Sequence, residues 1–316
     1  MKVFSNWLAG GGPESPITLS IVLVVYNMRR AAPRSIRSLL TPYQRGIDSE
    51  SYEIIVVENG SSEPLDKASI ESLAPNVRYH YLQDPPPSPA YAINYAVARA
   101  RGEILAIMVD GAHMVTPGVL RWGLVPFAYE SNPIVAAPRF FLGHESQVES
   151  VHKGYDEQQE DALLDSIEWP KDGYRLYEVS VPYRYNFASG PPKLFWFVRQ
   201  FESNCLFVRK AAFLAVGGCD ERFDLPGGGC LMPDLYKELC EMSDASIVQL
   251  LGEASFHQVH GGISTSSTRE KQVEQWAEYT AQYEQIRGIP FEVSQKPQQF
   301  VGHMPQGPAR RLMLTG

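Results

Sequence analysis

Short apolar runs alternate with helical stripes along most of the chain. Runs dense in β-branched or aliphatic residues occur at 17–27, 52–57, 77–82, 104–109, 134–138, 201–209, 247–251 and 254–259. Uninterrupted runs of this length are typical of strands buried on both faces of a sheet. Between them, stretches such as 90–101 and 117–124 carry apolar residues at helical spacing. This alternation predicts a doubly wound α/β fold, with a mostly parallel mixed sheet and helices on both faces.

An aromatic-rich insert interrupts the alternation between about 141 and 200. It combines an acidic helix at 157–167 with tyrosines, phenylalanines and a tryptophan among several prolines. Two interpretations stay open for these rings. They either cover a sugar or line an acceptor groove, or they pack as the core of a β-ribbon.

The two ends of the chain differ in pattern from its middle. Residues 1–16 end in three glycines and a proline and predict a loose tail. Residues 263–316 predict an amphipathic helix, begun by a Ser-Thr-Arg-Glu capping box and ended near Gly288, and then a trailing tail. The helix must pack on the body or on another chain, so a homodimer is one of two alternatives. We therefore expect one α/β domain over 17–262 between a tail and a helical extension.

Composition and charge exclude several function classes. A net charge of -8 at pH 7 and a pI near 5.5 argue against a protein that wraps nucleic acid. Four cysteines without CxxC spacing argue against a zinc site and suit a reducing cytoplasm. No apolar run approaches about 18 residues, and no export signal is visible. We therefore expect a cytoplasmic protein, with peripheral membrane contact through an acceptor as the remaining alternative.

Ionisable residues follow the predicted strands at the edge where ligands of open α/β sheets bind. Glu58 ends the second strand, Asp110 follows the run at 104–109, and His113 lies three residues further on. His257 and His260 close the last strand ahead of two glycines. Each of these residues could instead have a purely structural role in a turn, a helix cap or the core. Together they predict one site at this edge.

In chain order, these landmarks resemble the nucleotide-sugar glycosyltransferases of family 2, which have the GT-A fold. Residues 20–27 resemble the family's opening strand, 56–61 its Val-Asp-Asp-Gly-Ser turn and 92–94 its Ala-x-Asn helix. Residues 98–103 resemble its Ala-x-Gly-Glu segment, 109–113 its Asp-x-Asp motif and 217–223 its Gly-Gly-Phe-Asp-Glu-x-Phe segment. Each motif alone is weak, but their common order is specific. The resemblance covers roughly 17–262. It implies transfer of a sugar from a nucleoside diphosphate sugar to a hydroxyl of a saccharide or other acceptor, with inversion, in saccharide or glycoconjugate assembly.

The resemblance also implies a set of nucleotide-sugar-binding residues: Val25, Tyr26, Asn27, Glu58, Asn94, Asp110, Gly111 and Ala112. The residue types agree with parts of this assignment. Glu58 can accept a hydrogen bond from a nucleobase N–H, and Asp110 would face the ribose or a metal ion.

Two departures from the family concern the metal and the catalytic base. Ala112 replaces the second Asp of Asp-x-Asp, commonly the direct metal ligand. A divalent cation, Mn²⁺ or Mg²⁺, would then depend on Asp110 with His113, His257 or His260, or be weakly held or absent. Histidine beside carboxylate favours Mn²⁺ and similar ions.

The family's Glu-Asp motif is missing after the glycines of 227–229. Asp234 is the first candidate for the base and Glu202 the second, while an N-cap role is the alternative for Asp234.

Two rival functions remain at this stage. A catalytically silent nucleotide-sugar-binding module would suit Ala112 and the altered Glu-Asp region. A nucleotidyltransferase would need a basic, glycine-rich loop after the first strand, and residues 26–30 carry no glycine.

Overall fold

The computed structural model describes residues 17–183, 195–261, 269–304 and 307. Its main sheet has the order β12-β10-β6-β9-β4-β1-β2-β3. The strands are β1 (Leu19–Val25), β2 (Tyr52–Asn59), β3 (Val77–Leu82), β4 (Ile104–Met108), β6 (Asn132–Ala136), β9 (Leu206–Arg209), β10 (Ala245–Leu251) and β12 (Gln298–Gly302). Strand β9 runs antiparallel to β4 and β6, and the other neighbours in this sheet are parallel. The predicted mostly parallel mixed sheet is confirmed.

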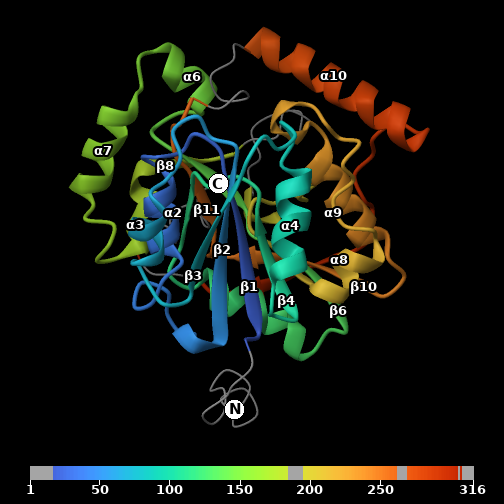
Figure 1. Ribbon diagram of the computed structural model, residues 1–316, viewed down its shortest axis with the longest axis horizontal. Helices are drawn as coiled ribbons and strands as arrows, with labels where there is room; N and C mark the ends of the chain where they lie inside the picture. Colours follow the sequence, from blue (N-terminus) through green and yellow to red (C-terminus); the bar gives the residue numbers. More distant parts are fainter. Residues whose placement is uncertain (1–16, 184–194, 262–268, 305–306, 308–316) are drawn as a thin grey trace.

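Helices cover both faces of the sheet (Figure 1). Helices α2 (Ala32–Ser38), α3 (Lys67–Glu71) and α5 (Val119–Leu124) pack on one face, and α4 (Ala90–Arg99), α8 (Lys210–Ala215) and α9 (Leu231–Glu241) pack on the other. Short 3-10 helices lie at Ser49–Ser51, Val125–Ala128, Gly173–Val179, Phe195–Phe197 and Pro226–Gly228. Side chains alternate along each strand, so β1 and β2 supply aliphatic residues to both cores.

A second sheet stands at the carboxyl end of the first. Its order is β5-β11-β7-β8, formed by β5 (His113–Val115), β11 (Ser255–His257), β7 (Arg139–Leu142) and β8 (Ser180–Pro182). In the antiparallel pair β5 and β11, His113 lies opposite His257. The register of this small sheet therefore joins two histidines that are far apart in sequence.

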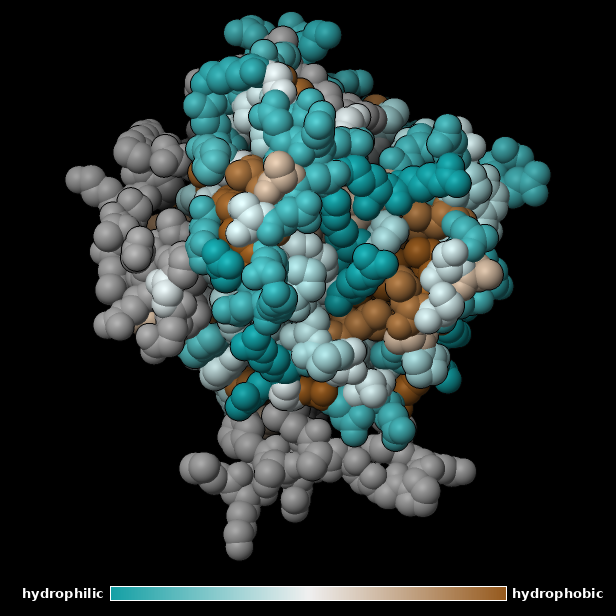
Figure 2. Space-filling view, turned by 90° about the vertical axis from the view of Figure 1, so that its left-hand side faces the viewer, coloured by the Kyte–Doolittle hydropathy of each residue, from teal (hydrophilic) through white to brown (hydrophobic). Residues whose placement is uncertain are grey.

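The insert between β7 and β8 contains α6 (Gln147–His152) and α7 (Glu157–Ser166). Hydrophilic residues dominate the surface on this side of the molecule (Figure 2). Several of the insert's rings instead pack inward: Tyr177, Phe195 and Trp196 are buried against Phe140 and Phe256. For these rings the core interpretation holds. Tyr185 and Phe187 lie outside the described residues.

Helix α10 (Arg269–Arg287) packs on the body of its own chain. Tyr283 is fully buried, and Trp276 and Ile286 are partly buried against the core under α9, whereas Val273 of the predicted stripe is 63% exposed. The apolar contacts that a homodimer would need are thus largely made within the chain, and the structure does not support that dimer. The start of the capping box, at 267–268, lies outside the described residues.

The sequence predicts an irregular tail after Gly288, and this is wrong for one segment. Residues 298–302 form β12, which pairs in parallel with β10 at the edge of the main sheet. The pattern Gln-Gln-Phe-Val-Gly has too few apolar residues to signal a strand. Pairing with an open edge, not its own propensity, makes this segment a strand.

Candidate active site

Three ring nitrogens converge on one carboxylate oxygen just beyond the carboxyl end of β4. The Oδ2 atom of Asp110 lies 3.2 Å from His257 Nε2, 3.4 Å from His260 Nε2 and 4.0 Å from His113 Nε2. The Nε2 atoms of His257 and His260 are 3.1 Å apart. Asp110, His257 and His260 form a group whose ligand atoms all lie within 4.8 Å of one another. The prediction that Asp110 and His260 share a site is thus consistent with the geometry.

The protonation of the cluster follows from burial and charge. Burial alone would raise the pKa of the Asp110 carboxyl, but the nearby charge of His260 contributes to holding that pKa well below its usual range. Burial lowers the pKa of His113 far below its ordinary value and also lowers that of His257. His260 differs, because the charge of Asp110 outweighs burial and raises its pKa. The charge of Asp110 therefore favours the protonated form of His260.

His113 stands at the edge of this cluster. It is 1% exposed, its Nδ1 lies 3.2 Å from Ser255 Oγ, and its ring packs edge-on against that of His257. Its Nε2 is buried and has no hydrogen-bond partner among the described residues. A buried ring nitrogen without a partner is costly, unless it is available to a ligand.

The backbone of Asp110 is held by Asn204, which lies two residues before β9 begins. Asn204 Oδ1 accepts from Asp110 N–H at 2.9 Å, and Asn204 Nδ2 donates to Asp110 O at 3.1 Å. Asp110 Oδ1 in turn accepts from the N–H of Ala112 at 2.8 Å. The loop after β4 is thus fixed while Oδ2 stays directed at the histidines.

Gly111 and Ala112 serve the shape of this loop. A Cβ on Gly111 would lie 2.7 Å from Val25 Cγ2 and 2.9 Å from Val24 O, so the loop needs glycine here. The side chains of Val25 and Ala112 are fully buried in the core. Contact of these two side chains with a nucleotide sugar, as the family resemblance implied, does not agree with their burial.

Asn27 and Tyr26 do lie at the exposed sheet edge. Asn27 adopts a left-handed conformation (φ 52°), donates its N–H to Ser61 Oγ at 2.8 Å and accepts from Ser62 N–H at 3.0 Å. It thereby joins the loops after β1 and β2. The Tyr26 ring beside it is 55% exposed. These two residues remain suitable for a nucleotide pocket.

Glu58 does not face that edge. It is fully buried on the side of β2 that also presents Ile54 and Val56, and its Oε2 accepts from Leu65 N–H at 2.8 Å and Tyr79 O–H at 2.6 Å. The side chain of Asn59 points to the other face and donates to Pro86 O at 3.2 Å. The expected convergence of Glu58 with Asp110 and His260 on one pyrophosphate does not agree with this burial, because strand alternation turns Glu58 inward.

Asn94 has a structural role in α4. Its Nδ2 donates to Cys219 O at 2.9 Å and to Glu221 Oε1 at 3.0 Å, and its Oδ1 accepts from Cys219 N–H at 2.9 Å. The amide is thus used to hold the Gly-Gly-Cys-Asp-Glu segment. Its predicted contact with the nucleotide sugar does not agree with these bonds.

The two predicted base candidates differ in their surroundings. Glu202 lies two residues before Asn204 and pairs through Oε1 with Arg139 at 3.0 Å, with 21% of its side chain exposed. Arg139 is close enough to the cluster to lower the pKa of His257. Glu202 is thereby on the same sheet edge as Asp110.

Asp234 is held elsewhere, in the first turn of α9. Its Oδ1 accepts from Arg287 Nε at 2.7 Å and its Oδ2 from Arg287 Nη2 at 2.6 Å, and its side chain is 4% exposed. Both oxygens are occupied by the last residue of α10. This arrangement ties two helices together and suits a structural ion pair better than a base.

Sequence reasoning missed three residues that support the cluster: Gln147, Glu160 and Asn204. Gln147 and Glu160 lie in the insert, more than 90 residues before the histidines that they approach. No local spacing signals such contacts. The available signal was a polar residue at an inward-packing position of a predicted helix, as at Glu160.

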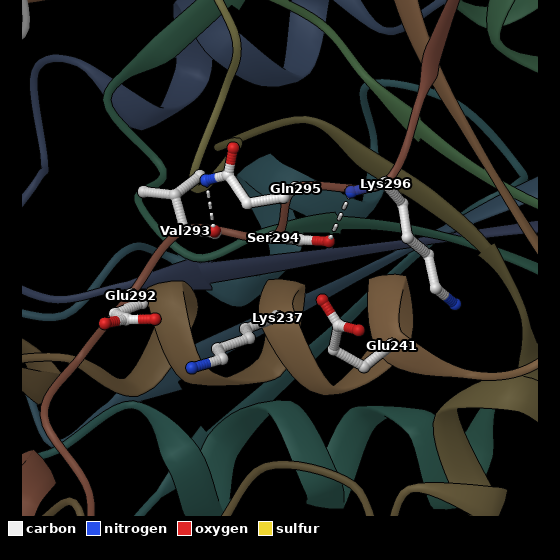
Figure 3. Close-up of a pocket in the computed structure, with 7 residues that line it drawn as sticks. All are labelled: Lys237, Glu241, Glu292, Val293, Ser294, Gln295 and Lys296. Carbon is white, nitrogen blue, oxygen red and sulfur yellow. Dashed lines mark hydrogen bonds between the residues drawn. The ribbon is translucent and has the colours of Figure 1, made fainter.

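A groove of about 420 Å³ lies elsewhere, between α9 and residues 292–296 (Figure 3). Lys237 and Glu241 border it from the helix, and Lys296 and Ser294 from the chain above. None of the predicted site residues lines it. We assign no function to this groove.

None of the helices in the described residues has the length and apolar character that a membrane span requires.

Solved structures share the fold of this chain at low sequence identity. Staphylococcus aureus TarS (residues 1–349) in complex with UDP-GlcNAc superposes with a TM-score of 0.50 at 13% identity, over 84% of this chain and 66% of that one. The chain thus spans just under two thirds of that TarS structure. Glucosyl-3-phosphoglycerate synthase from Mycobacterium tuberculosis, in complex with Mn²⁺, UDP and phosphoglyceric acid, gives 0.50 at 17% identity, over 88% and 81%. These likenesses support the GT-A fold.

A comparison with curated proteins found no match. The sequence profile of glycosyl transferase family 2 matches residues 20–197, more than half of the chain. The match includes β1, β2 and β4 and the loops that follow them. The chain therefore belongs to glycosyl transferase family 2.

Proposed function

We propose that this enzyme transfers a sugar from a nucleoside diphosphate sugar to a hydroxyl of a saccharide or other acceptor. The observation that supports this proposal best is the Asp110, His257 and His260 cluster at the carboxyl end of β4. In open α/β sheets this edge is where ligands bind. The structures of TarS with UDP-GlcNAc and of the mycobacterial synthase with UDP make a uridine nucleotide the first donor to test.

The cluster has the donors that a divalent cation needs. Asp110 Oδ2 and the Nε2 atoms of His257 and His260 would hold it, with His113 Nε2 as an additional buried nitrogen without a hydrogen bond in the described structure. Two imidazoles with one carboxylate favour Mn²⁺ over Mg²⁺, which prefers oxygen ligands. When bound, the cation would neutralise charge on the departing nucleoside diphosphate.

Ala112 is compatible with such a site. Its methyl group is fully buried in the core, and His257 of β11 and His260 of the loop after it would supply the ligands that a second aspartate would. The change in the Asp-x-Asp motif therefore alters the ligand set and does not by itself abolish the site.

We assign the general base to Glu202 and not to Asp234. Glu202 lies two residues before Asn204, which anchors the Asp110 backbone, part of its side chain is exposed, and its pairing with Arg139 orients it. Deprotonation of an acceptor hydroxyl by this carboxylate, with attack in line with the departing diphosphate, would invert the sugar's configuration in one displacement. Asp234, with both oxygens bound by Arg287, would hold α10 in place.

The biological setting rests on the family resemblance. Cytoplasmic saccharide or glycoconjugate assembly suits the composition, and residues 17–262 would form the catalytic domain with 263–316 as its extension. Strand β12 adds to that domain's sheet from within the extension.

A panel of nucleoside diphosphate sugars, assayed for hydrolysis and transfer with and without Mn²⁺, tests the proposal. We expect turnover with one or a few donors, stimulated by Mn²⁺ and strongly reduced in an Asp110→Asn variant. Tight donor binding without turnover would favour a silent binding module. Release of inorganic pyrophosphate from a nucleoside triphosphate and a sugar phosphate would favour a nucleotidyltransferase.

A further inference from the structure

Two insert helices reach the segment that carries the cluster's histidines. Gln147 in the first turn of α6 and Glu160 in the first turn of α7 are both fully buried. The two helices lie together on one side of the molecule (Figure 1). Each of these side chains contacts the chain between His257 and His260. The mechanism proposed above uses neither of them.

Gln147 makes two bonds to one residue. Its Nε2 donates to the backbone carbonyl of His257 at 3.0 Å, and its Oε1 lies 2.5 Å from His257 Nδ1. Because a carbonyl only accepts, the amide nitrogen must face His257 O, and the amide oxygen must face the ring. The oxygen also only accepts, so Nδ1 must carry the hydrogen. The lone pair of the neutral ring then lies on Nε2, the atom directed at Asp110.

Glu160 and Arg30 hold the next part of the segment. Glu160 Oε2 accepts from Val259 N–H at 2.8 Å, and Arg30 Nη1 donates to Val259 O at 3.3 Å and to Glu160 Oε1 at 3.1 Å. Arg30 also donates to Asp161 at 2.5 Å. The peptide groups of Val259 are thus fixed on both sides, one residue before His260 and two before Gly261, whose φ is +70°.

We propose that α6 and α7 form a clamp that presets the cluster for a divalent cation: Gln147 fixes the tautomer and ring orientation of His257, and Glu160 fixes the backbone that carries His260. Both are positioning residues, since neither side chain reaches the cation site itself. The inference rests on the proposed function, because it concerns the cation that this function invokes. Outer partners of metal-binding histidines typically contribute about 10–100-fold to metal affinity.

Mn²⁺ binding to the full chain, measured by titration calorimetry, tests the clamp. Gln147→Met keeps the side-chain length and removes both amide contacts, and we expect about 10–100-fold weaker binding. Glu160→Met removes the acceptor of Val259 N–H, and we expect weaker binding here too. Gln158→Met, at an exposed position of α7, is the matched control and should bind like the unmodified protein.

Nitrogen NMR of the histidine rings in metal-free protein gives a readout that simple packing would not change. We expect the His257 hydrogen on Nδ1 in the unmodified chain and on both nitrogens in exchange in Gln147→Met. Unchanged Mn²⁺ affinity in both Met variants, or an unchanged His257 tautomer in Gln147→Met, overturns the clamp alone. Failure of the unmodified protein to bind Mn²⁺ instead overturns the proposed cation and, with it, this inference.

Discussion

Two carboxylates near opposite ends of the central sheet, the buried Glu53 and the half-buried Asp110, have contrasting surroundings. Glu53, near the amino end of β2, accepts through Oε1 from Ser20 Oγ and Arg101 N–H, both at 2.7 Å. Its Oε2 accepts from Arg78 at 2.7 Å and Arg101 Nε at 2.8 Å. Asp110, at the carboxyl end, instead has three ring nitrogens crowded around one oxygen.

The difference separates a structural cluster from one that can take a ligand. Around Glu53 each contact joins a donor to an acceptor, so the charge is satisfied within the chain. Around Asp110, the Nε2 atoms of His257 and His260 face each other at 3.1 Å and that of His113 has no hydrogen-bond partner among the described residues. A proton on His260 would reduce the repulsion between these ring nitrogens, and a bound cation would reduce it more fully.

The largest effect is expected at Glu202, the paired carboxylate beside the Asp110 cluster. Glu202→Gln should reduce kcat for transfer by about 10²–10⁴-fold, because general-base catalysis contributes on that scale. Steady-state kinetics with the donor found in the panel measure this. If Glu202 only pairs with Arg139 for structure, transfer will be nearly normal in the folded variant.

Asp234→Asn is the matched control for that measurement. It should lower stability, because Arg287 loses a charged partner, and leave kcat within a few-fold of normal. Loss of transfer in Asp234→Asn, with Glu202→Gln active, would reverse the two assignments.

Asp110→Asn should reduce transfer by about 10²–10³-fold, the scale on which removal of one electrostatic stabiliser acts. Glu53→Gln, in the paired cluster, should leave transfer per folded molecule unchanged. Equal loss in the two variants would remove the functional distinction between the clusters.

Mn²⁺ should stabilise the protein through the Asp110 cluster. At a free concentration 100 times Kd, the free energy of unfolding should rise by about 2.7 kcal/mol. Denaturant titration with Mn²⁺ or with EDTA measures the change. The same stabilisation in Asp110→Asn would place the cation elsewhere.

Glu53→Gln should lower the free energy of unfolding by about 2 kcal/mol at pH 7, because it removes hydrogen bonds to a charged group. Burial would raise the pKa of Glu53, but the hydrogen bonds from Ser20 and Arg101 together lower it below the unfolded value of 4.5. Its stabilisation is thus present above pH 4.5 and is lost as pH falls through the folded pKa. The difference between variant and unmodified protein should shrink below pH 4.5, and a constant difference would contradict this.

Much of the fold could be predicted because it is encoded locally. Strand β3 begins and ends where the sequence indicates, and β2 and β4 differ at their ends by two residues or fewer, because buried parallel strands are continuous apolar runs. Strand β12 could not be predicted, since its stability comes from an edge that only the folded sheet provides. The sequence also places the start of β9 too early, because residues 201–205 form an irregular segment in which Asn204 anchors the Asp110 backbone.

The sequence predicts the candidate metal-binding residues of the site but not the residues that hold them in place. Asp110 follows β4, His257 ends β11 and His260 lies just after it, and the strand-end rule is enough to bring them together. Glu58 follows the same rule but faces inward, because one residue of register decides the face of a strand. Asn94 matches a family motif, yet its amide is hydrogen-bonded to Cys219 and Glu221. Contacts such as Gln147 to His257 depend on tertiary structure and leave no mark in local sequence.

Strand β12 has a consequence for how much of the chain must be expressed together. It covers the outer edge of β10, and His303 just beyond it bonds to the buried Glu253 at 2.5 Å. A chain shortened at residue 288 would leave the row of β10 N–H and C=O groups open to pairing with another molecule. Such a fragment, though it keeps every proposed catalytic side chain, is expected to aggregate.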